Sequence, residues 1–94
     1  MLLNEQEWEK AWSVTFKPVA GGRLHLKYPD GEERVFDVWN WMKRTGRTKG
    51  FWKNLFDQDY FNSVTVVGRA VPSWDDDLIT LAPELLFTDS DPIN

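Results

Sequence analysis

The stretch LHLKYPDGEERVFDV, residues 24–38, decides the predicted fold class. Leu24, Leu26 and Tyr28 alternate with polar residues, and this period of two is typical of a strand with one buried face. The Pro-Asp-Gly run at 29–31 predicts a tight turn, because proline presets φ and glycine accepts a positive φ. Residues 33–38 return with a second alternating pattern. We therefore predict an antiparallel hairpin.

A further strand is expected before this hairpin. Trp12, Val14 and Phe16 alternate with polar residues, and Pro18 limits the strand because proline cannot donate to a ladder. The Ala-Gly-Gly run at 20–22 predicts the turn into the hairpin. The three alternating segments therefore predict three strands of one sheet.

Short helices are expected before and after these strands in the sequence. Asn4 and Glu7 have the spacing of a capping box, Asp57 can cap a helical turn, and Pro83 can open one. Gly46 interrupts the apolar pattern that follows the hairpin. The expected helical segments are 4–11, 57–62 and 83–86, with a broken helix or structured loop over 39–56.

The remaining residues complete an α+β plan. Val64, Val66 and Val67 predict a strand that ends at Gly68, and residues 70–74 are its expected hairpin partner. Pro72 would place that partner at an edge or a bulge. The sum is about five short, mostly antiparallel strands with two or three short helices packed on one face. We expect a single domain over 1–94, with its core at about 12–87, a helical segment at 4–11 and a frayed tail at 89–94.

Composition narrows the function classes. The 94 residues include six Trp and no Cys, which excludes a disulfide, a thiolate metal site and a cysteine nucleophile. The start lacks the pattern of a secretory signal, and no apolar run reaches the roughly 20 residues that span a bilayer. We therefore expect a cytoplasmic protein without membrane association. Nothing in the sequence indicates a cofactor. The net charge of −4 argues against general nucleic-acid binding, which depends on neutralising phosphates.

One segment, residues 39–53, combines cations with aromatic rings and contains no acidic residue. Trp and Arg often anchor protein interfaces, and cations between aromatic rings can also hold single-stranded nucleic acid. The alternative is that the Trp rings belong to the core and the cations solvate a loop. The candidate partner-binding residues are Trp39, Trp41, Lys43, Arg44, Arg47, Lys49, Trp52 and Lys53.

Other polar groups point less clearly to a site. The acidic run at 75–77 lacks the glycine and distal glutamate of a calcium loop, so a turn is expected there. His25 is the only histidine and falls on the polar face of its strand, where a surface position is expected. The adjacent Glu32 and Glu33 could take part in acid–base chemistry, but they follow a turn, where solvated side chains are expected. No catalytic residue and no metal ligand is therefore assigned.

Over residues 12–87 the chain resembles the bacterial domain-of-unknown-function family numbered 2442. The resemblance rests on LHLKYPDG leading to VFD at 24–37 and on FWKNL and DYFNSV at 51–64. It also rests on Trp74-Asp75 with Asp77, and on LAPEL at 81–85 with Phe87. It departs from the family in the segment before residue 12, the insertion at 39–50 and Ile79-Thr80. The resemblance implies a small α+β domain without an established activity. Some relatives carry a helix-turn-helix domain or are encoded beside small proteins in arrangements that look like toxin–antitoxin pairs, which by analogy favours a regulatory or binding role.

The leading hypothesis is therefore a non-catalytic binding or regulatory module that contacts another small protein through residues 39–53. It predicts that Trp41, Lys43, Arg44 and Arg47 are substantially exposed. The alternatives are single-stranded nucleic-acid binding by the same segment and an enzyme of unknown reaction. The sequence does not indicate an oligomeric state.

Overall fold

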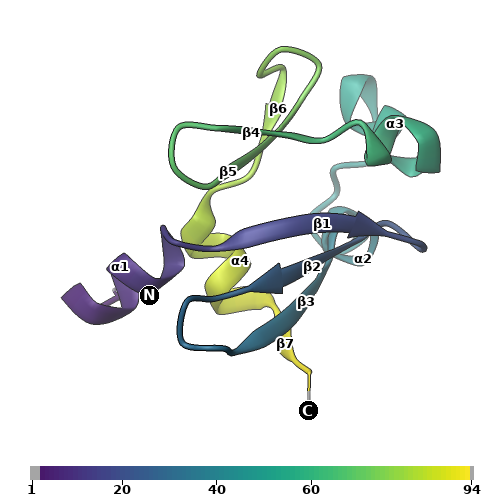
Figure 1. The fold of residues 1–94 in the computed structure, drawn as a ribbon. Coiled ribbons are helices and arrows are strands. Elements are labelled where there is room, and N and C mark those ends of the chain that lie inside the picture. Colours follow the sequence, from purple (N-terminus) through teal and green to yellow (C-terminus); the bar gives the residue numbers. More distant parts are fainter. Residues whose placement is uncertain (1–2, 94) are drawn as a thin grey trace.

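The computed structural model describes residues 3–93 and has an α+β fold with two antiparallel sheets (Figure 1). The strands of the first sheet, in spatial order, are β1 (Thr15–Val19), β2 (Arg23–Lys27), β3 (Glu33–Asp37) and β7 (Asp91–Pro92). The strands of the second sheet are β4 (Thr65–Val67), β5 (Val71–Trp74) and β6 (Ile79–Thr80). The helices are α1 (Glu5–Ala11), α2 (Val38–Arg44), α3 (Gln58–Asn62) and α4 (Pro83–Asp89), together with the 3₁₀ helix η1 (Gly50–Phe56).

The predicted hairpin is confirmed as β2–β3. Leu24 pairs with Phe36 across the strands, and both side chains are buried, with Leu24 0% exposed. The Gly31 N–H donates to the Tyr28 carbonyl at 3.0 Å, and Gly31 has a φ of 92°. Burial also raises the pKa of Tyr28 to about 12. The alternation therefore places one face of the hairpin in the core, as expected.

The strand before the hairpin is present but shifted. The capping box of Asn4 and Glu7 is confirmed, and the α1 turns continue until the Trp12 N–H donates to the Trp8 carbonyl. β1 therefore begins at Thr15, not Trp12, and continues through Pro18 to Val19. β1 is an edge strand, so no strand lies on its outer side, and the missing N–H of Pro18 costs no ladder bond there.

Two expectations about the C-terminal half are wrong. Pro72 was expected at an edge or bulge, yet β5 is the central strand of the second sheet. The Leu81 N–H donates to the Pro72 carbonyl, so the backbone of Pro72 faces the side of β6. The two residues of β6 pair only with Ser73 and Trp74, so Pro72 lies beyond the paired residues of this ladder, where its missing N–H is tolerated. The tail was expected to fray, but residues 91–92 pair with β3 as β7, while Asn94 lies outside the described residues.

The core lies between the first sheet and the elements that follow it. α4 leads from the second sheet to β7 (Figure 1), and its Phe87 ring packs edge-on against Tyr28. The second sheet is fixed to α3 because the buried Trp74 indole donates to the Phe61 carbonyl at 2.9 Å. The interruption predicted within 39–56 is confirmed, since α2 ends before Gly46 and η1 starts at Gly50. The segment 39–53 consequently lies outside both sheets.

Candidate functional site

The end of α2 determines where the first cations of the segment lie. Gly46 has a φ of 76°, and its N–H donates to the Lys43 carbonyl at 3.4 Å. The Arg47 N–H donates to the Met42 carbonyl at 2.8 Å. These two bonds form the Schellman motif that commonly ends a helix at glycine. The motif turns the chain sharply, so that Arg47 returns toward the helix that precedes it.

Arg47 lies against two tryptophan rings. Its guanidinium carbon is 4.7 Å from the centroid of Trp41 and 5.5 Å from that of Trp52. The two rings are in edge contact at 6.0 Å. A cation over an indole face is stabilised by the ring quadrupole. Arg47 therefore joins α2 to η1 and remains half-buried between them.

A second set of contacts fixes the other side of α2 to η1. The Lys43 ammonium lies 5.9 Å from the Phe56 ring, and the Trp39 indole donates to the Leu55 carbonyl at 2.5 Å. Trp39 also packs on the turn between β1 and β2, where a Cβ added to Gly22 would lie 2.0 Å from the indole. Only glycine leaves room for this ring. The aromatic residues of the segment thus hold α2 and η1 on the body of the protein.

The expectation that Trp41 is exposed is wrong, because the side chain is 7% exposed and belongs to the core. Trp39 and Trp52 are half-buried and pack against the same core. The apolar neighbours on β2 and β3 account for the difference, since Trp41 also contacts the Phe36 ring. The expected exposure of Lys43 and Arg44 is confirmed, and Lys49 and Lys53 are exposed as well. The expectation for Arg47 is wrong, because its guanidinium packs against Trp41 and Trp52 and the side chain is half-buried.

Phe51 is the one exposed aromatic side chain of this segment. Its side chain is 43% exposed, and its ring stacks on Trp52 at 6.0 Å. We call the five cations of residues 43–53 together with this ring the cationic surface. The cationic surface consists of Lys43, Arg44, Arg47, Lys49, Phe51 and Lys53.

The cations of this surface differ from the others in their ion pairing. Of the eleven Lys and Arg side chains, Lys10, Arg23, Arg34 and Arg69 form ion pairs with carboxylates. Among residues 3–93, none of the five cations between residues 43 and 53 has such a partner. Lys17 and Lys27, on the outer face of the first sheet, also have none in that range. Sequence reasoning missed these two lysines, although their place on the polar face of alternating strands was a usable signal.

The other polar groups singled out in the sequence have local roles. Asp75, Asp76 and Asp77 form the turn between β5 and β6, as expected, and all three have a positive φ. Asp77 accepts from the Ser73 hydroxyl at 2.6 Å, which anchors this turn. Within residues 3–93, no group of three or more His, Asp or Glu side chains is placed to hold a metal ion.

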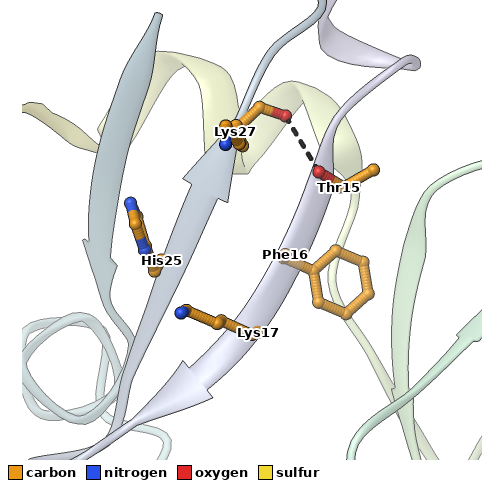
Figure 2. A pocket seen from close by; sticks show the side chains of 5 residues that line it. All are labelled: Thr15, Phe16, Lys17, His25 and Lys27. Atoms are coloured by element: carbon orange, nitrogen blue, oxygen red, sulfur yellow. Dashed lines mark hydrogen bonds between the residues drawn. The ribbon is translucent and has the colours of Figure 1, made fainter.

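His25 pairs with a carboxylate at the rim of a shallow depression. Its Nε2 lies 2.7 Å from Glu33 Oε1, and the depression, of about 190 Å³, is lined by Lys17, Lys27 and neighbours (Figure 2). A hydrolytic triad would need a hydroxyl beside this imidazole. Each of the four serine hydroxyls bonds elsewhere, to Glu9, Arg34, Tyr60 or Asp77 groups. The geometry consequently gives this pair no serine nucleophile.

Comparison with known proteins adds no relative to this description. Neither a family model, nor a curated protein, nor a solved structure matches the chain. In the part of the chain that the structure describes, no helix has the length and apolar character that crossing a bilayer requires.

Proposed function

We propose that the protein is a non-catalytic binding module that contacts an acidic surface of another protein through the cationic surface. The observation that carries this proposal is the set of five cations without an ion-pair partner among residues 3–93, in a chain of net charge −4. Complementary charge steers association and sets specificity. The resemblance to family 2442, with its toxin–antitoxin-like and regulatory arrangements, supports a partner that is itself a small protein.

The geometry of the aromatic residues favours a protein partner over single-stranded nucleic acid. Stacking of successive bases needs several open ring faces. The Arg47 guanidinium covers Trp41 and Trp52, and Trp39 faces the turn at Gly22. Phe51 is left as the exposed ring of the segment. One aromatic side chain beside five cations suits a carboxylate-rich surface with an apolar residue among the acids.

The test uses a fluorescein-labelled peptide of twelve glutamates around a central phenylalanine, with labelled twelve-nucleotide oligo-dT as the competing ligand. We expect the peptide to bind, and binding to be lost in the triple variant Arg44→Ala/Lys49→Ala/Lys53→Ala. The control variant Gln6→Glu/Thr80→Glu/Thr88→Glu lowers the net charge equally at exposed positions outside the segment. It should retain most of the affinity.

Two results would contradict the proposal. Equal losses in the two triple variants would mean that net charge alone drives binding. Tighter binding of oligo-dT than of the peptide, with an affinity that falls steeply between 50 and 200 mM salt, would mean that the cationic surface binds nucleic acid.

A further inference from the structure

A groove of about 470 Å³ separates the two sheets along their edge strands. β1 is an outer strand of the first sheet, and β4 is an outer strand of the second. The apolar side chains of Val14, Phe16, Val64 and Val66 line the groove, and Val66 is 57% exposed. A groove bounded by two sheet edges offers backbone groups as well as apolar contacts.

The register shows which backbone groups of β1 face the groove. The Tyr28 N–H donates to Glu32, so the backbone of Tyr28 faces β3. Along an antiparallel strand the N–H and C=O of one residue point to the same side, and this side alternates. His25 and Lys27 therefore face β1, where their partners are Lys17 and Thr15. It follows that the intervening residues, Phe16 and Pro18, turn their backbone groups away from β2 toward the groove.

The opposite wall presents its backbone in the same way. Pro72 turns its carbonyl toward β6, where Leu81 donates to it. Its partner on β4, Val66, therefore directs its N–H and C=O away from β5 and toward the free edge. Within the described residues 3–93, the groove thus has unpaired backbone groups on both sides.

The side chains of β1 define the chemistry of a strand laid beside it. Phe16 lies on the same face as Leu26, while Lys17 lies on the other face beside His25. Figure 2 shows Phe16 directed away from Lys17, His25 and Lys27, toward the faint green ribbon of the second sheet. A matching strand would place apolar side chains beside Phe16 and acidic side chains beside Lys17, with Lys27 on the same face one strand further in. Neither lysine has an ion pair among residues 3–93.

We propose that the β1 edge binds an extended peptide of alternating apolar and acidic residues, which joins the first sheet as an added strand. The peptide exchanges two hydrogen bonds with Phe16 and donates a third to the Pro18 carbonyl. A second copy of this chain is a poorer occupant, because its own β1 would bring Lys17 to the same cationic face and because Pro18 offers no donor. This site is separate from the cationic surface and does not depend on the function proposed for it.

The experiment titrates the ¹⁵N-labelled protein with an acetylated, amidated octapeptide of alternating valine and aspartate. We expect saturable binding that slows hydrogen exchange of the Phe16 amide by at least about tenfold. Lys17→Glu should weaken binding roughly fivefold, which is the scale of an exposed charge reversal. The double variant Thr80→Glu/Thr88→Glu is the matched control, because it lowers the net charge by the same two units at exposed positions that do not line the groove, and it should leave the affinity unchanged. A peptide of alternating valine and lysine should not bind.

N-methylation of the peptide separates strand pairing from charge attraction. The valine N–H groups would face β1, so methylating them should abolish binding, whereas methylating the aspartate amides should weaken it less. The proposal would be overturned by equal effects of the two methylations, or by unchanged affinity in Lys17→Glu. Shifts confined to residues 43–53 would overturn it as well, while leaving the cationic surface as the binding site.

Discussion

The cations around α1 and the central hairpin have different surroundings from those between residues 43 and 53. Lys10 pairs with Glu32 and, at 2.7 Å, with Asp30, so that it ties α1 to the hairpin turn. Arg34 pairs with Glu32 and donates to the Ser90 hydroxyl and carbonyl. These charges fasten chain segments that are distant in sequence.

Among residues 3–93, the cations of the cationic surface contact aromatic rings or have no ion-pair partner. Lys43 and Arg47 lie over aromatic faces, which stabilises α2 on η1 without neutralising the charge. Acids are not scarce, since the chain has fifteen Asp and Glu. One set of cations is therefore neutralised by carboxylates that fasten the fold, whereas the other has no ion pair among residues 3–93, and two of its members stabilise the fold through aromatic rings instead.

The largest loss of stability should follow from removing one of the ion-paired cations. Arg34→Ala removes bonds from a mostly buried guanidinium to Glu32 and Ser90, and should lower the free energy of unfolding by about 2 kcal/mol. Arg44→Ala, the matched change in the second set, should alter it by less than about 0.5 kcal/mol. Urea denaturation followed by tryptophan fluorescence measures both. Similar losses in the two variants would remove the contrast.

A smaller loss of stability is expected at Arg47, which belongs to the cationic surface and also packs against aromatic rings of the core. Arg47→Ala removes the cation from Trp41 and Trp52, and should lower the free energy of unfolding by about 1 kcal/mol. Arg47→Lys keeps the charge but loses the planar stacking, so it should recover only part of this loss. Thermal unfolding of the three proteins gives the comparison. An Arg47→Ala protein as stable as the wild type would mean that this contact is not structural.

The acidic turn between β5 and β6 offers a stabilising change. Asp76 has a φ of 51°, a region that glycine adopts without the clash of a Cβ. Asp76→Gly should therefore raise the free energy of unfolding by roughly 0.5–1 kcal/mol. Asp77→Gly should gain less, because it loses the bond to the Ser73 hydroxyl. Denaturation of the two variants side by side decides the order, and the reverse order would contradict this account.

The smallest effect is the pH dependence of the Lys10 contacts. The bond from Lys10 holds the pKa of Asp30 and the pKa of Glu32 below their usual values. The folded protein therefore binds fewer protons than the unfolded chain in acid, and stability falls as the pH drops through the range below about 4. Lys10→Met should reduce this loss of stability in acid. Arg44→Ala is the control and should show the same pH dependence as the wild type. Urea midpoints measured between pH 6 and pH 3 test this, and parallel curves for the wild type and Lys10→Met would oppose it.

Local patterns predicted the local structure well. The alternation around Leu24, the Pro29–Gly31 turn and the capping box of Asn4 depend on residues within a few positions of each other, and all three are confirmed. The α+β class follows from them. The position of β1 was harder to predict, because Trp12 has the period of a strand but continues the turns of α1.

Long-range contacts could not be predicted in the same way. The burial of Trp41 depends on Phe36, and the position of Trp39 depends on the space above Gly22. The Gln58 side chain ties α3 to the β1–β2 turn by accepting from Gly21 at 3.0 Å, and no local pattern indicates this bond. The sequence therefore indicated the segment, while the structure places four of its five cations at exposed positions and its Trp rings largely in the core.

The most direct test maps where the glutamate-rich peptide binds. Titration of the ¹⁵N-labelled protein should shift the amides of residues 43–53 and the Trp52 indole N–H, with the free energy of unfolding of the triple alanine variant close to that of the wild type. Shifts centred on Lys17 and Lys27 instead, or a triple variant that no longer folds, would contradict the proposal that Arg44, Lys49 and Lys53 serve a partner and not the fold.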